Sequence, residues 1–99
     1  MSAHTSGPWS IWNFSDDPRH VAVGPDAGGL AVADVVACNA HGCYTVETES
    51  RGQANARLIA AAPELLTCLL DVLDANGDVN VMDFNRYRAT VAKATGNAA

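Results

Sequence analysis

The chain has 99 residues, of which 48% are hydrophobic and only 6% aromatic, and its formal net charge is −5. This length allows one domain, residues 1–99, and the acidic balance argues against broad nucleic-acid binding because phosphate backbones repel it. With few aromatic anchors the core must be modest in size, so a homo-oligomeric interface is a reasonable supplement to it.

The apolar segments are short. None reaches the roughly 18 to 20 residues that a membrane-spanning helix needs. Residues 1–8 have neither the basic region nor the apolar core of a signal peptide, and three cysteines without such a signal are typical of reduced thiols. We therefore expect a cytoplasmic protein that does not enter a membrane, with residues 1–7 and 96–99 loose.

The first half of the chain favours strands. Residues 9–14 are rich in strand formers, residues 20–23 form a short apolar run, and residues 30–37 alternate small and apolar side chains. Polar, proline-containing and glycine-containing connections separate them. Residues 44–48 also alternate, which indicates a fourth strand at a sheet edge. These patterns predict a small antiparallel sheet of three to four strands over about residues 8–49.

The second half favours helices. We predict a first helix from about Gln53, a break at Pro63, and a second helix that starts there, because proline suits the first helical turn and disrupts a helix interior. Asn80 is the predicted cap of a third helix, with Phe84, Tyr87, Val91 and Ala94 on its inner face. Residues 53–95 thus form a helical hairpin, and the fold class is α+β, a small sheet followed by helices.

One cluster contains metal-ligand residue types. Cys38, His41 and Cys43 lie within six residues of one another, and His20 or Cys68 would supply a fourth zinc ligand. The spacing matches no common zinc module closely, and a connection that carries these residues by chance is the simpler interpretation. We therefore expect no cofactor, with zinc as the weaker alternative.

A second candidate is an anion site built from arginines. Arg57, Arg86 and Arg88 would meet phosphate or another anion, and Tyr87 or Trp12 would stack on a ring. The alternative is that these arginines lie on solvated helix faces and the aromatic residues in the core. Arg57 is the most informative, because its neighbours are almost all small or apolar and it must reach solvent, a carboxylate or a ligand.

Two segments resemble a family of small phage and prophage proteins of mostly unknown function. These are His-Thr-Ser-Gly-Pro-Trp at residues 4–9 and Asn-Ala-Arg-Leu-Ile-Ala-Ala-Ala-Pro-Glu-Leu-Leu at residues 55–66. The resemblance implies a phage origin and supplies no catalytic residues.

A phage origin, together with the lack of a catalytic constellation in the sequence, favours a non-enzymatic binding protein. We expect it to counter a host defence system, either as an inhibitor of a defence protein such as a CRISPR effector or as a sponge for a nucleotide immune signal. The alternative is a structural or regulatory accessory protein of the phage with no defence target. The expected setting is the cytoplasm of an infected or lysogenic bacterium.

Overall fold

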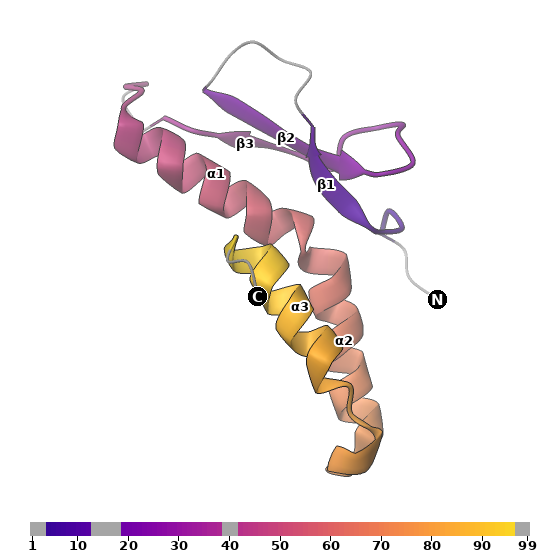
Figure 1. Cartoon of the computed structure of the whole chain (residues 1–99). Helices are drawn as coiled ribbons and strands as arrows, with labels where there is room; N and C mark the ends of the chain where they lie inside the picture. Colours follow the sequence, from indigo (N-terminus) through magenta and orange to yellow (C-terminus); the bar gives the residue numbers. More distant parts are fainter. Residues whose placement is uncertain (1–3, 13–18, 39–41, 97–99) are drawn as a thin grey trace.

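The computed structural model describes residues 4–12, 19–38 and 42–96, and it has the predicted α+β architecture (Figure 1). A three-stranded sheet precedes the helices along the chain. The elements, in chain order, are β1 (Trp9–Trp12), β2 (His20–Pro25), β3 (Ala33–Val36), α1 (Val46–Ala60), α2 (Ala62–Ala75), the 3-10 turn η1 (Val79–Val81) and α3 (Phe84–Thr95).

The sheet is antiparallel with strand order β1-β2-β3. Val23 pairs with Ile11 on one side and with Ala33 on the other, which fixes the register of all three strands. The buried side chains of the sheet face α1, where Ala56 and Ala60 complete the core. Because these contacts on α1 are alanines, the helix approaches the sheet closely, and the core is small, as the composition predicts.

The predicted fourth strand is wrong, because residues 46–48 begin α1. The side chain of Thr45 accepts a hydrogen bond from the backbone N–H of Thr48 at 3.1 Å, and the Thr48 hydroxyl oxygen accepts one from the N–H of Thr45 at 2.8 Å. This reciprocal capping box satisfies the first turn of a helix, and Glu47 and Glu49 complement its dipole. Local capping therefore outweighs the short alternating pattern, and α1 starts seven residues before the predicted Gln53.

The predicted break at Pro63 is confirmed. Helix α1 ends at Ala60, Ala61 is its C-cap, and α2 begins at Ala62 with Pro63 in its first turn. Figure 1 shows the chain changing direction at this point, so that α2 and α3 run away from the sheet as a hairpin.

The start of the third helix differs from the prediction. Asn80 does not cap it; the Asp78 carboxylate instead accepts from the N–H of Asn80 and forms the separate turn η1. Asp83 is the cap of α3, since its carboxylate accepts from the N–H of Arg86 at 3.0 Å. The inner face of α3 agrees in part with the prediction: Ala94 is buried, together with Thr90, whereas Phe84 and Val91, also predicted to face inward, are exposed.

The molecule is elongated, with extents of 48 × 28 × 22 Å. Its radius of gyration is 15.6 Å, against about 13 Å for a compact domain of this length. Helix α2 contains no buried residue, and with α3 it projects away from the sheet (Figure 1). None of the helices in the described ranges has both the length and the apolar character needed to cross a bilayer.

Candidate functional site

The two segments that carry the family resemblance meet in space. Gly7, in the arm before β1, packs on Pro63 at the start of α2 so closely that a Cβ on Gly7 would lie 2.6 Å from the Pro63 Cβ. The arm is held by the Trp9 indole N–H, which donates to the Thr5 carbonyl oxygen at 3.2 Å, and by the edge of the His4 ring against Trp9. We call this contact region the motif junction, residues 4–9 and 63–70.

A lysine from α3 ties the motif junction together. Lys93 Nζ donates to Glu64 Oε1 at 2.7 Å and to the Trp9 carbonyl oxygen at 3.0 Å. It thereby links β1, α2 and α3 through one partly buried ammonium group. The second carboxylate oxygen, Glu64 Oε2, is buried and has no hydrogen-bond partner within the described residues. This side of the junction therefore carries an acceptor that its surroundings do not satisfy.

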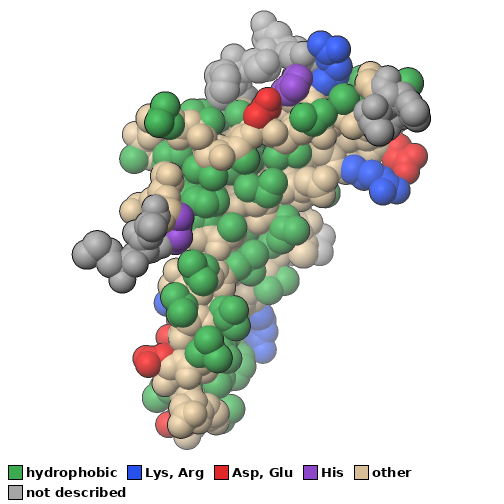
Figure 2. All heavy atoms as spheres, turned by 180° about the vertical axis from the view of Figure 1, so that it is seen from behind, with side chains coloured by type: hydrophobic (Ala, Val, Ile, Leu, Met, Phe, Trp, Pro, Cys, Tyr) green, Lys and Arg blue, Asp and Glu red, His purple; other side chains and the backbone are tan. Residues whose placement is uncertain are grey.

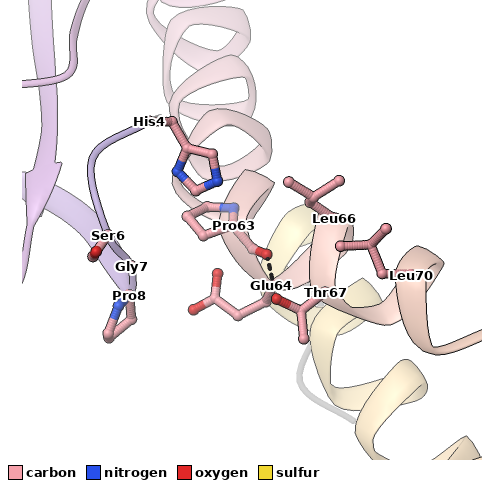
Figure 3. Close-up of a pocket in the computed structure, with 9 residues that line it drawn as sticks. All are labelled: His4, Ser6, Gly7, Pro8, Pro63, Glu64, Leu66, Thr67 and Leu70. Atoms are coloured by element: carbon pink, nitrogen blue, oxygen red, sulfur yellow. Dashed lines mark hydrogen bonds between the residues drawn. The ribbon is translucent and has the colours of Figure 1, made fainter. Parts of the chain in front are cut away.

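A groove of about 590 Å³ lies at the motif junction, between the arm and α2 (Figure 3). Its lining combines apolar and polar side chains, and the Glu64 side chain points into the space between α2 and the arm at Pro8. Among the described residues, no lysine or arginine lines it. The lining residues are His4, Ser6, Gly7, Pro8, Pro63, Glu64, Leu66, Thr67 and Leu70.

Arg57 does not face this groove. It lies against Gly96 at the C-terminal end of α3, where a Cβ on Gly96 would be 2.5 Å from Arg57 Nε. The guanidinium is therefore next to the partial negative charge of a helix terminus, which favours a cation there. Arg57 Nε is buried and makes no hydrogen bond with any described residue.

Arg86 and Tyr87 lie at the opposite end of α3, against α2. The Tyr87 hydroxyl donates to the Asp71 carboxylate, Arg86 reaches the same oxygen at 3.5 Å, and its guanidinium lies 5.9 Å from the centre of the Tyr87 ring. The hydrogen bond to Asp71 raises the pKa of Tyr87 above its ordinary value. Arg88 is exposed on α3.

The five predicted binding residues therefore do not converge on one pocket. Arg86 and Arg57 contact opposite ends of α3, about 15 Å apart along the helix axis. Trp12 lies in the sheet, where its ring covers Gly24: a Cβ at Gly24 would be 2.3 Å from the indole. Arg86 and Tyr87 lie together, and both are engaged with Asp71.

The metal prediction remains untested because His41 lies outside the described residues. Within the described residues there is no group of three potential metal ligands. The two candidates for a fourth ligand have other roles: His20 Nδ1 lies 2.9 Å from Asp34, and the Cys68 thiol donates to Thr90 on α3 at 3.4 Å.

A second hollow, of about 570 Å³, lies beside Cys38 at the start of α1. Its only lining cation, Arg51, is paired with Glu47 on the same helix at 2.9 Å, among the residues that the structure describes. This hollow therefore offers no unpaired positive charge to an anion.

Comparison with family models gives a match over residues 1–98 to the family described as Salmonella phage P22 protein Y8K6. The chain belongs to this family. The predicted phage origin is thus confirmed, and the family description gives no activity. Comparisons with curated proteins and with solved structures give no match.

Both halves of the motif junction are recognisable in the sequence, but their contact was not predicted. Two signals within the chain point to the contact. Gly7 is the one residue of the arm without a side chain, next to a proline, and Glu64 and Lys93 are oppositely charged residues on two helices predicted to pack together. Neither signal specifies a contact on its own, because each is also typical of a solvated surface.

Proposed function

We propose that this member of the Y8K6 family is a non-catalytic binding protein that counters a host defence system by occupying a defence protein. It acts in the cytoplasm of the infected or lysogenic bacterium, as a homo-oligomer. The motif junction is the binding site in this proposal, and the bound group is an exposed segment of the target that carries an apolar side chain and a basic one.

The composition of the groove supports this choice of ligand. Its walls are Pro8, Pro63 and two leucines, its one charged lining residue is Glu64, and among the described residues no lysine or arginine lines it. An apolar side chain gains by leaving water, and a basic side chain meets the Glu64 carboxylate, whose Oε1 is already paired with Lys93. The net charge of −5 adds long-range attraction to basic surfaces. Defence proteins that handle nucleic acid, such as CRISPR effectors and nucleases, need such surfaces.

The alternative, a sponge for nucleotide signals, has less support. A sponge requires cations and aromatic rings gathered in one enclosed pocket. Arg57 and Arg86 instead lie at opposite ends of α3, and among the described residues no lysine or arginine lines the groove, whose carboxylate, Glu64, is already paired with Lys93. A structural or regulatory role in the phage without a defence target is the remaining alternative, and no feature of the groove favours it.

Binding measurements separate these functions. The tagged protein is used to purify partners from defended bacteria, and each partner is then remade in pure form and titrated by calorimetry. The proposal predicts saturable binding of a defence protein and no heat with cyclic nucleotides or cyclic ADP-ribose-type signals. Heat with a nucleotide signal would favour the sponge, and the absence of binding to any defence protein would favour the accessory role.

Thr67→Arg is the variant that tests the groove. It places a cation and a large side chain in the groove, and it should abolish binding. Thr95→Arg is the matched control, because both threonines are exposed on helices and both donate to the carbonyl oxygen four residues earlier, Pro63 and Val91 respectively. Equal binding by the two variants would contradict the assignment of the groove.

A further inference from the structure

Four leucines form an apolar stripe on α2 that no described part of the chain covers. They are spaced i, i+3, i+4 and i+7, which places them on one face of the helix. Their exposed fractions are 42, 56, 56 and 67%. We call this set the leucine stripe: Leu66, Leu69, Leu70 and Leu73. Figure 2 shows hydrophobic side chains gathered along the helical hairpin on this side of the molecule.

The leucine stripe points directly away from α3. The residues of α2 that bond to α3 are Glu64, Cys68 and Asp71. At 100° per residue these three lie within about 60° of one another, and the stripe is centred on the opposite side of the helix. Helix α2 is therefore amphipathic in an unusual sense: its polar face packs inside the molecule and its apolar face is left outside.

The chain as a whole exposes more surface than a compact monomer of its mass. The accessible surface is 6798 Å², about 1,400 Å² more than expected for a compact monomer of this mass. A standard interface removes about 800 Å² from each partner. This surplus belongs to the whole chain, and it is larger than the area that one partner of a stable dimer contributes.

We propose that a second copy of this chain packs on the leucine stripe, with the two α2 helices antiparallel about a two-fold axis near Leu69 and Leu70. The stripe contains no charged residue, so it complements an apolar surface like itself and not the basic target of the groove. A two-fold axis brings the same patch of both copies together, which a continuous leucine row satisfies. The dimer then has α2 paired with α2 between two outer α3 helices.

This dimer changes the groove as well. Leu66 and Leu70 belong to the stripe and also line the groove, so the second copy forms part of the groove's outer wall. The inference deepens the homo-oligomer part of the proposed function and does not depend on which defence protein is bound. Each dimer would present two equivalent grooves, one on each side of the two-fold axis.

Sedimentation of the purified full chain at micromolar concentrations tests the proposal. The wild type should sediment at twice the 10.3 kDa chain mass. Leu69→Glu and Leu73→Glu should sediment as monomers with the wild-type circular dichroism spectrum, because both positions are exposed within one copy. Neither residue lines the groove.

Val91→Glu is the matched control. Val91 is 54% exposed on α3, close to the 56% of Leu69, but it lies outside the stripe. This variant should remain a dimer. A monomeric wild type at all concentrations, or a dimer that survives Leu69→Glu and Leu73→Glu, would overturn the proposal. A dimer lost equally in Val91→Glu would overturn the placement of the interface. Each result is read on the pure protein, so it is independent of target binding.

Discussion

Lys93 Nζ on α3 lies 2.7 Å from Glu64 Oε1 on α2, and the same nitrogen reaches the carbonyl oxygen of Trp9 in β1. One ammonium group therefore joins the arm and first strand to both helices of the hairpin. The ion pair is about two-thirds buried on each side, and Glu64 at the start of α2 also complements the helix dipole. These bonds hold the motif junction in place.

Removing that ammonium should destabilise the fold. Lys93→Met keeps the length of the side chain and leaves the Glu64 carboxylate partly buried without its partner, which costs about 1–3 kcal/mol of unfolding free energy. Denaturant titration measures the change. The control is Arg51→Met, which breaks an exposed ion pair with Glu47 on α1 and should cost about 0.5 kcal/mol or less. Equal losses would contradict the role assigned to Lys93.

The contact between Arg57 and Gly96 can be tested with a matched glycine. Gly96 and Gly77 have φ angles of +75° and +86°, yet a Cβ would meet Arg57 only at Gly96. Alanine at either position costs about 1–2 kcal/mol for the left-handed backbone. Gly96→Ala should cost more than Gly77→Ala, and the excess should disappear in an Arg57→Ala background. Thermal unfolding of Gly96→Ala, Gly77→Ala, Arg57→Ala and the two double variants measures this coupling, and additive effects would argue against the contact.

Helix α1 is fitted to the sheet at Gly52. A Cβ there would lie 2.5 Å from the Cβ and 3.0 Å from the Cα of Ala37, just after β3. Gly52→Ala should therefore destabilise the protein by about 1–3 kcal/mol through overpacking, although alanine is the better helix former. Ser50→Ala, at an exposed position of the same helix, should leave stability unchanged or raise it. Denaturant midpoints decide the comparison, and a stabilised Gly52→Ala would show that the two elements are farther apart.

The Tyr87 phenol should ionise at a higher pH than a free tyrosine. Its hydrogen bond to Asp71 favours the neutral form and raises the pKa above its ordinary value, about 10. Because the folded-state pKa is raised, this contribution to stability is present below about pH 10 and is lost as the pH rises through the raised pKa. Tyr44 has a raised pKa too, through its hydrogen bond to Glu49, so a Tyr44→Phe background isolates Tyr87.

Phenolate absorbance against pH measures the Tyr87 pKa. Asp71→Asn should move the titration to lower pH in that background, and Glu49→Gln should leave it unchanged. If Asp71→Asn leaves the Tyr87 titration unchanged, the hydrogen bond is not the cause of the raised pKa.

The sequence predicts the parts of the fold that depend on local chemistry. Pro63 ends one helix and starts the next because a ring without an N–H fits only the first helical turn, and that break is confirmed. The start of α1 was missed since residues 44–48 satisfy strand alternation as well as a helix cap. The cap uses a second threonine, Thr48, where a glutamate or glutamine would have been the more recognisable signal.

The candidate site was predictable only in part. The two segments of the motif junction are visible in the sequence, but the contact of Gly7 with Pro63 depends on how the arm folds back over α2. The apolar neighbours of Arg57 make it conspicuous in the sequence, but they do not predict its contact with a helix end 39 residues later in the chain, at Gly96. Such long-range partners are set by tertiary packing, which local patterns do not encode.

Phage plating on a panel of defended bacterial strains tests whether the motif junction serves counter-defence. Strains that express the wild-type chain or Thr95→Arg should regain plating of a phage that one of the defence systems restricts, and strains that express Thr67→Arg at the same level should not. Restoration by Thr67→Arg as efficient as that by the wild type, or no restoration by the wild type on any defended strain, would contradict the proposal.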